Sequence, residues 1–571
     1  MNRRLSVLIA LSLSVCFAQE QQQQQQQQQP QPSSEMRTFP DPAAPARVGV
    51  GITQRQLSLE DAIQMALSNN LDIDIQRTNR STAETNVNVA RGFFDPTFRW
   101  TPLLETRNTP AGSVLQGSSG KLTDKGFVNN FYLQQRLPKW GSLVQLDFEN
   151  SRTTSTNPFQ SFNPILSSRL LIGFTQPLLR GRLIDRERAQ LRISQKQVNA
   201  SNIDLESRVI EIVGRVEQAY WDLVAARQAV AVSQDTVSWA REQVAINQRL
   251  INAGTLAPIE LAAAEAELQR RMDTWYTNIG ALTEIENNLK TLIAPERVAS
   301  IWNDEIIPTE VRTVAEPQAD DLREAVQTAL KRRPELRGIG VQREINDVQK
   351  DLNADLQKPQ VNFVGQYWLS GLGGTVNNIT NPFSESSAAQ IQRLNDLSVR
   401  LGLQPLPTGS LGGAPPDFLV GNYGTALGNL FGGRYQSFQV GLSLDFNFRN
   451  RSANANYSQT LINEKRLGLE KARAEQVIEA QVRNALQGIQ TARQRIAAAK
   501  ASARAAREKL ESEQRLYQTG ESTNFLVLTR QNEYADSRRR EVVARLDFNK
   551  SVSRLQQAVG TTLSTYAISV K

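Results

Sequence analysis

Apolar residues recur at every seventh position between residues 209 and 254. One row is Val209, Val216, Leu223, Val230, Val237, Val244 and Ile251, and a second row, three positions on, is Ile212, Ala219, Ala226, Ser233 and Ala240. A seven-residue apolar period is typical of a long helix that supercoils against a partner helix, and small residues in the second row permit close packing. The pattern therefore predicts a coiled-coil helix in this region.

The same pattern returns in the second half of the chain. Its two rows are Val482, Ile489, Ile496, Ala503, Leu510 and Tyr517, and Ala485, Ala492, Ala499 and Ala506. In both halves the rows end in an Arg-Leu-x-x-x-Gly motif, formed by Arg249, Leu250 and Gly254 and by Arg515, Leu516 and Gly520. A further helical pattern follows each motif. We therefore predict two long helical hairpins in tandem repeat, over residues 182–293 and 450–559.

The start of each half also repeats, at the constant offset that separates Leu59 from Leu322. Leu59, Ala62, Ala66, Leu67, Ile73 and Pro96 match Leu322, Ala325, Ala329, Leu330, Leu336 and Pro359. Ser58 precedes the first of these segments, and acidic residues follow it, so it is predicted to cap a helix. In both copies the helices end at a proline. These matches predict two structural repeats, residues 51–310 and 311–571.

Apolar and polar residues alternate between the helical patterns, over residues 97–177 and 360–448. In residues 438–448, for example, every second residue is apolar. One apolar face over about 10 residues fits a strand that crosses a bilayer, but a half-buried strand of a soluble sheet has the same pattern. Residues 107–126 and 371–433 are rich in Gly, Ser, Asn and Pro, which predicts outward-facing loops.

The beginning of the chain has the pattern of a secretory signal. In residues 1–18, two arginines precede an apolar run that ends near Cys16. A lipoprotein signal with an acylated Cys16 is the alternative interpretation. Residues 19–50 combine a glutamine tract with several prolines, which predicts a disordered leader. The mature chain is therefore expected outside the cytoplasm.

Composition excludes several kinds of chemistry from the mature chain. Histidine is absent from the 571 residues and Cys16 is the only cysteine, which removes histidine bases, thiolate nucleophiles, disulfides and most zinc sites. No glycine motif for phosphate binding is present. The net charge of +8 comes from basic residues interleaved with Glu, so nucleic acid is not an expected partner. We predict no enzyme activity, no cofactor and no metal.

The order of helix, strands, long helix, turn and return helix occurs twice and resembles the TolC-like outer-membrane efflux family over essentially all of the mature chain. The most specific matches are the two Arg-Leu-x-x-x-Gly motifs and the paired openings at Leu59 and Leu322. The resemblance implies a mixed fold, in which an all-α coiled-coil tube joins a transmembrane β-barrel in a homotrimer. It also implies the outer membrane of a Gram-negative bacterium, with a long periplasmic extension.

The function that the resemblance implies is a passive exit duct. Its expected partners are a periplasmic adaptor protein, an inner-membrane pump and outer-membrane lipid, in a tripartite efflux or type I secretion system. A secreted coiled-coil scaffold or adhesin is the alternative, but it leaves the alternating strands without a role. An enzyme is least favoured, because no acid, base or nucleophile has a recognisable setting.

The number of strands decides the size of a barrel. Two strands per half give four per chain, which are too few to close alone. In the homotrimer that the resemblance implies, three chains would form a 12-stranded barrel. Geometry alone would also permit a dimer with eight. A turn-like segment at residues 137–141 suggests an additional hairpin, and six strands per chain would give 18. Twelve is the preferred expectation.

Two groups of residues are candidate functional sites. The resemblance implies that the two motifs, Arg249, Leu250 and Gly254 with Arg515, Leu516 and Gly520, contact the adaptor. Family members narrow the tube with acidic side chains on the helix after the second motif, where this chain has Leu526 and Thr529. An apolar constriction is therefore one candidate aperture, unless Leu526 is ordinary coiled-coil core. A charged ring formed by Glu260 and Glu265 is the competing candidate.

Overall fold

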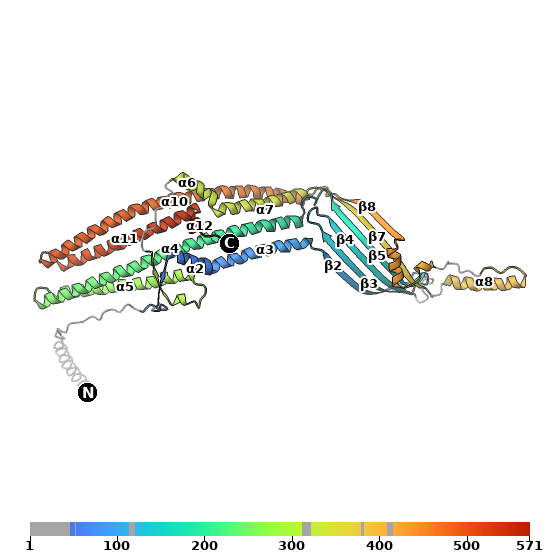
Figure 1. Ribbon diagram of the computed structural model, residues 1–571, viewed down its shortest axis with the longest axis horizontal. Helices are drawn as coiled ribbons and strands as arrows, with labels where there is room; N and C mark the ends of the chain where they lie inside the picture. The colour runs from blue at the N-terminus through green and yellow to red at the C-terminus, as the bar shows by residue number, and fades with distance from the viewer. Residues whose placement is uncertain are drawn as a thin grey trace, which may run out of the picture. The chain divides into compact units, whose positions relative to one another are not determined.

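The computed structural model describes residues 46–51, 53–113, 120–310, 321–377, 382–407 and 415–570. The chain from Gly49 to Lys571 forms one compact unit, and residues 1–48 form another, of which residues 46–48 are described. All elements described below belong to the larger unit (Figure 1). The predicted signal peptide with Cys16, and residues 19–45 of the predicted leader, lie outside the described residues.

Both halves of the chain contain short helices, then strands, then a long helical hairpin. The first half contains α2 (Leu59–Asn69), α3 (Leu71–Arg91), β2 (Thr97–Pro110), β3 (Lys121–Arg136), β4 (Leu143–Ser155), β5 (Phe162–Pro177), α4 (Arg186–Asn252) and α5 (Pro258–Ile293). The second half contains α6 (Leu322–Arg332), α7 (Pro334–Leu356), β7 (Gln360–Val376), α8 (Pro382–Arg400), α9 (Tyr423–Phe431), β8 (Tyr435–Asp445), α10 (Arg451–Gln518) and α11 (Asn524–Val559). A parallel pair of short strands, β1 (Gln54–Leu57) and β6 (Glu305–Pro308), and the short helix α12 (Thr562–Thr565) complete the unit.

Side-chain caps determine where the first helices begin. Ser58 accepts a hydrogen bond from the amide of Asp61, which confirms that it caps α2. Asp185 caps α4 by accepting from the amide of Arg188. The long helix therefore begins at Arg186, four residues later than the predicted start of the hairpin at residue 182.

The β-sheet contains six strands, so the prediction of four strands per chain was too low. Its order is β2-β3-β4-β5-β7-β8, with every neighbouring pair antiparallel. The additional strands come from the first half, where the turn suggested at residues 137–141 joins β3 to β4. Gly141 has φ +67° there, and its amide donates to the carbonyl of Leu137 over 3.1 Å.

The two predicted loops are shorter than expected. Within residues 107–126, both ends belong to strands, because Arg107 pairs with Asp124 and Pro110 with Lys121. Backbone hydrogen bonds extend this hairpin through polar residues that show no apolar alternation, so composition was a poor guide. Within residues 371–433, β7 continues to Val376, and helices α8 and α9 follow.

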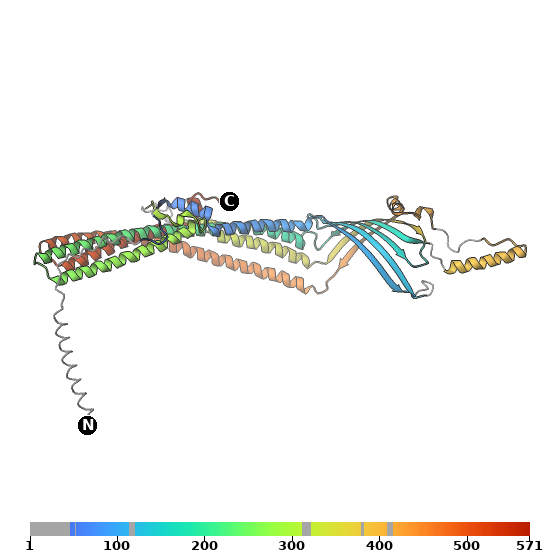
Figure 2. The ribbon, with the colours of Figure 1, turned by 90° about the horizontal axis from the view of Figure 1, so that it is seen from below.

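The long helices continue from one end of the sheet in a single curved layer (Figures 1 and 2). Next to the sheet the helix order is α3, α4, α7, α10, since each of these helices contacts the next. Farther from the sheet the order is α5, α4, α11, α10. Because a helix rises 1.5 Å per residue, the 67 residues of α4 extend roughly 100 Å.

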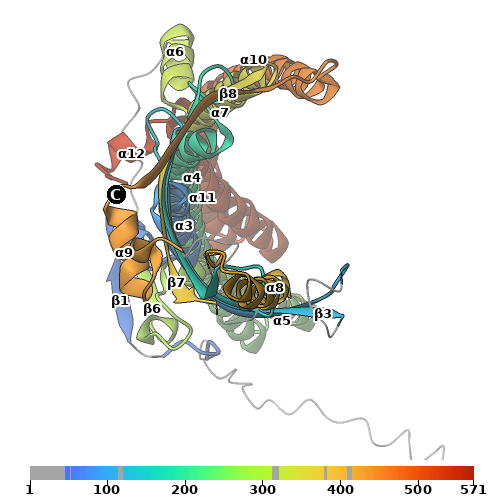
Figure 3. The same cartoon turned by 90° about the vertical axis from the view of Figure 1, so that its right-hand side faces the viewer.

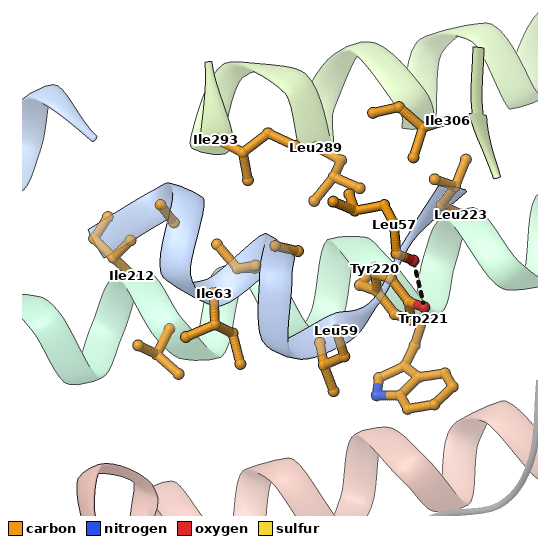
Figure 4. Close-up of a cluster of buried hydrophobic side chains, with 14 of the residues drawn as sticks. Leu57, Leu59, Ile63, Ile212, Tyr220, Trp221, Leu223, Leu289, Ile293 and Ile306 are labelled. Carbon is orange, nitrogen blue, oxygen red and sulfur yellow. Dashed lines mark hydrogen bonds between the residues drawn. The ribbon is translucent and has the colours of Figure 1, made fainter. Parts of the chain in front are cut away.

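The predicted heptad rows form much of the hydrophobic core. Val209, Ile212, Val216, Leu223, Val237 and Ala240 are buried in α4, and Val482, Ile489, Ala492, Ala503, Ala506 and Leu510 are buried in α10. Figure 4 shows the largest cluster, in which α2, α4, α5 and the β1/β6 pair meet around Tyr220. The Tyr220 hydroxyl donates to the carbonyl of Leu57 over 3.1 Å, which satisfies its buried oxygen.

Candidate functional site: the two sheet faces and the helical tips

One face of the sheet carries apolar side chains in two rows, of which one crosses all six strands and the other crosses β2 to β7. The strand register aligns Phe98, Leu133, Leu146, Ile172, Tyr367 and Phe438 in one row, and Trp100, Phe131, Phe148, Leu170 and Leu369 in the next. Phe131 stacks on Phe98, Trp100 and Phe148 at 6.2–6.3 Å between ring centroids. Phe438 is 80% exposed in the single chain. This face therefore presents a broad apolar band to its surroundings.

The opposite face is polar. Arg169 forms a salt bridge with Glu149 at 3.6 Å, and its guanidinium lies over the ring of Trp368. The guanidinium of Arg99 lies over the ring of Tyr132. Asn130, Glu149, Arg169, Ser370 and Tyr435 line a hollow of about 620 Å³. Figure 3 shows that the sheet is curved, with α9 on its convex side. α9 packs against Gly371 and Gly373, which by strand alternation share the apolar face with Tyr367, so the polar face is the concave side.

Both Arg-Leu-x-x-x-Gly motifs form the same helix end. Gly254 has φ +74° and Gly520 has φ +80°, a left-handed conformation that glycine adopts readily. The amide of the residue after each glycine donates to the carbonyl of Leu250 over 2.9 Å and of Leu516 over 2.8 Å. The shared spacing thus encodes one capping geometry that ends α4 and α10.

The tip motifs lie on the surface of the unit. Arg249 and Arg515 are exposed and Leu516 is 39% exposed. A β-carbon added at Gly254 or Gly520 would meet no atom within 4 Å. Nothing in the described chain covers these turns, so they are accessible for contact with another molecule.

The aperture candidates lie on the two helices that leave the tips. Leu526 of α11 is 37% exposed, so it is not part of the buried core of this chain. The Thr529 hydroxyl donates to the carbonyl of Phe525 over 2.8 Å. Glu260 of α5 accepts from the Asn524 amide group over 3.3 Å and so joins the starts of both return helices. Glu265 is half-buried and lies one turn farther along α5.

A polar cluster that the sequence analysis missed joins α5 to α11. Arg271 donates to Gln531 and to Asn532, in each case over 3.1 Å, and it pairs with Glu267 at 2.9 Å. Burial opposes the charge of Glu267, but hydrogen bonds from Arg270, Arg271 and Asn532 outweigh it and hold the pKa of that carboxyl at about 2. Arg271 is separated from Gln531 by 260 positions, so no local pattern reveals the contact.

A second missed group is the carboxyl of Glu217, in the middle of α4. It is 1% exposed, and it accepts from the Ser553 and Tyr566 hydroxyls of α11 and the C-terminal segment. Burial raises its pKa to about 7, although the hydrogen bond from Tyr566 lowers it. This carboxyl therefore links three segments in a water-excluded site.

Two further features bear on function. The described residues contain no group of three or more acidic, His or Cys side chains that could hold a metal ion. Among the helices of the described ranges, none combines the length and the apolar composition that crossing a bilayer requires.

Comparison with known sequences identifies the family. The profile of the outer membrane efflux protein family matches residues 62–294 and 325–561, one match in each half of the chain. The chain belongs to this family. The resemblance to TolC-like channels is thus confirmed, and the protein is an outer-membrane efflux protein. No curated protein sequence matches the chain significantly.

Solved structures of outer-membrane channels have the same fold as this family member. The outer-membrane channel OprN shares 13% sequence identity, with a TM-score of 0.58 over 88% of this chain and 90% of that one. The CmeC channel of Campylobacter jejuni shares 15% identity, with a TM-score of 0.58 over 88% and 85%. VceC of Vibrio cholerae shares 12% identity, with a TM-score of 0.57 over 88% and 96%. The combination of long helices with a β domain is therefore common to all four proteins.

Proposed function

We propose that three chains close into one continuous channel, which conducts substrates passively from the periplasmic side of the outer membrane to the exterior. Six strands from each chain would form an 18-stranded barrel in place of the 12 strands first expected. The apolar convex face would contact lipid, and the polar concave face would line the pore.

The edges of the sheet carry this proposal. β2 and β8 each have a strand neighbour on one side only, so their other backbone groups need partners before the sheet can enter a bilayer. In an even-stranded antiparallel sheet, β2 and β8 run in opposite directions. The β8 edge of one chain can therefore pair antiparallel with the β2 edge of the next chain.

The helices at the edges support the same closure. α3 exposes Ile75 and Val89, and α10 exposes Ile462 and Leu469. These residues lie on the two outermost helices of the layer next to the sheet, where another copy of the chain would pack. Closing the ring buries both apolar surfaces, which stabilises it by about 25 cal/mol per Å² of apolar area removed from water.

The helical tips suit the role of an adaptor contact. In this proposal Arg249, Leu250 and Gly254, with Arg515, Leu516 and Gly520, meet a periplasmic adaptor protein that connects the channel to an inner-membrane pump. The assembly would be a tripartite efflux or type I secretion system. Two accessible turns of similar geometry in each chain would give such an adaptor six contacts around a trimer.

Two measurements on the purified protein test the channel. We expect extraction from outer membranes to require detergent and to yield a particle with the mass of three chains. Added to a planar lipid bilayer, that particle should produce discrete conductance steps. A monodisperse monomer that is stable without detergent would contradict the proposal.

A further inference from the structure

Helix α9 lies on the convex, apolar face of the sheet (Figure 3). By strand alternation, Gly371 and Gly373 of β7 face the same side of the sheet as Tyr367. Because they lack side chains, they leave space for the helix. A β-carbon at Gly371 would lie 2.1 Å from the carbonyl oxygen of Ala426, and one at Gly373 would lie 3.0 Å from the Ala426 amide nitrogen. Leu166 of β5 faces the same side and is buried.

Hydrogen bonds fasten α9 to the sheet. The side-chain amide of Asn429 donates to the carbonyl of Leu372 over 3.0 Å and to that of Phe418 over 2.8 Å. Phe418, which precedes the helix, and Phe431, its last residue, remain exposed. An apolar surface thus continues from the rows of the sheet onto α9 and its flanking residues.

Basic side chains border this surface on the same face. Phe127 pairs with Arg152 and Lys125 with Thr154, so Lys125 and Arg152 are diagonal neighbours. Arg152 also pairs with Leu166 of β5, a strand that α9 contacts. Both side chains are exposed, and neither forms a salt bridge with any described residue. The guanidinium of Arg434 lies 4.6 Å from the ring centroid of Phe418.

Acidic side chains of the neighbouring strands do not balance these charges. By strand alternation Glu105, Asp124 and Glu149 belong to the concave face. The Asp124 carboxylate accepts a hydrogen bond from Ser155. Asp417, in the turn before α9, is the acidic residue closest in sequence to the helix. The convex surface around α9 therefore has a positive excess next to an apolar area.

We propose that α9, Lys125, Arg152 and Arg434 form a binding surface for phosphate-bearing lipids of the outer leaflet. Guanidinium and ammonium groups bind phosphate oxygens by charge-assisted hydrogen bonds, and the exposed phenylalanines contact acyl chains below the headgroup. A soluble phosphate would use the charges but leave the apolar surface in water. The inference rests on the proposed channel, since only there does the convex face meet lipid.

The test uses the detergent-purified protein in nanodiscs of digalactosyldiacylglycerol, a neutral bilayer lipid without phosphate. Binding of a bisphosphorylated lipid A is compared with binding of its dephosphorylated form and of inorganic phosphate. The triple variant Lys125→Gln, Arg152→Gln, Arg434→Gln should bind the phosphorylated lipid at least tenfold more weakly. Arg107→Gln, a matched control on the concave face of β2, should leave binding unchanged.

Several outcomes would overturn the lipid surface. Equal binding of phosphorylated and dephosphorylated lipid, or unchanged affinity in the triple variant, would remove the role of the basic residues. Strong competition by inorganic phosphate would identify a site for the free anion. Unchanged lipid binding in Phe418→Ser, Phe431→Ser would exclude α9 from the surface.

Conductance of the same preparations separates this inference from the proposed channel. Pores of normal conductance combined with unselective lipid binding would refute only the lipid surface. Preparations that never conduct would refute the channel itself.

Discussion

Glu217 is a carboxyl group that the fold holds away from water. Its pKa is about 7 because burial disfavours the charged form, whereas the ordinary value is 4.5. The favourable contribution of this group is therefore fully present below about pH 4.5. It is lost as the pH rises through about 7, where the folded protein has to ionise a buried group.

Glu217→Gln should consequently stabilise the protein at alkaline pH. We expect a gain of roughly 3 kcal/mol at pH 8, since each unit of pKa difference corresponds to about 1.4 kcal/mol. The gain should become small at pH 5, where the native carboxyl is already protonated. Thermal unfolding of both proteins at the two pH values measures this effect, and an equal difference at pH 5 and pH 8 would contradict it.

The glycines of the tips are a second case where one residue determines local geometry. Replacing Gly254 and Gly520 by Val places a β-branched residue at positive φ, which costs about 1–2 kcal/mol per site. We expect substrate export by cells to fall while the assembled trimer persists on a native gel. Asn tolerates this conformation better, so the corresponding Asn variants serve as a control and should retain more export. Normal export by the Val variants would rule out a docking role for the tips.

At the scale of elements, α5 and α11 determine the structure next to the helical tips. Leu526 is exposed on α11, whereas Glu260 is engaged by Asn524. We therefore expect an apolar constriction, which resists wetting when closed. Leu526→Ser should raise the resting single-channel conductance several-fold, while Glu260→Gln and Glu265→Gln leave it unchanged.

Divalent cations provide the opposing test of the aperture. If they block the channel from the periplasmic side, and if either Glu substitution removes that block, a charged ring forms the gate. The apolar constriction would then be wrong.

The sequence predicted the long hairpins well because their signals are local and repeated. Each signal depends on residues that lie within a few helical turns of one another. Examples are the heptad row from Val209 to Ile251 and the capping spacing from Leu250 to Gly254. α9 was missed because nine residues that include Gly424 and Gly428 have little intrinsic helix propensity. That helix depends on packing against β7, and packing partners distant in sequence leave no periodic pattern.

The strands and the site were also hard to predict, because their contacts join residues that are distant in sequence. Polar residues such as Arg107 and Asp124 lie in paired strands, although their composition suggested a loop. The contacts of Arg271 with Gln531 and Asn532 join positions that only the duplicated fold brings together. Repetition in the sequence predicted that the hairpins exist, and the structure was needed to show which faces meet.

For the whole molecule, the outermost helices should control assembly. Ile462→Glu with Leu469→Glu places two charges on the exposed apolar side of α10, where the neighbouring chain is proposed to pack. We expect the trimer fraction in detergent to fall at least tenfold by mass photometry. Lys471→Glu changes charge on the same helix at a solvated position and provides the control. Unaltered trimers of the double variant would place the subunit contact elsewhere.

The unpaired edges of β2 and β8 also bear on how such a protein is produced. In a single chain, β2 with 14 residues and β8 with 11 residues each have one unpaired edge. Water can form hydrogen bonds with the backbone groups of these edges, but the hydrocarbon of a bilayer cannot. If one chain inserted at a time, those backbone groups would lie in hydrocarbon without hydrogen-bond partners. In the proposed trimer, recruitment of the three subunits must therefore precede or accompany entry into the lipid. The yield of inserted channel should then rise more steeply than linearly with the rate of synthesis, as in a reaction of order greater than one.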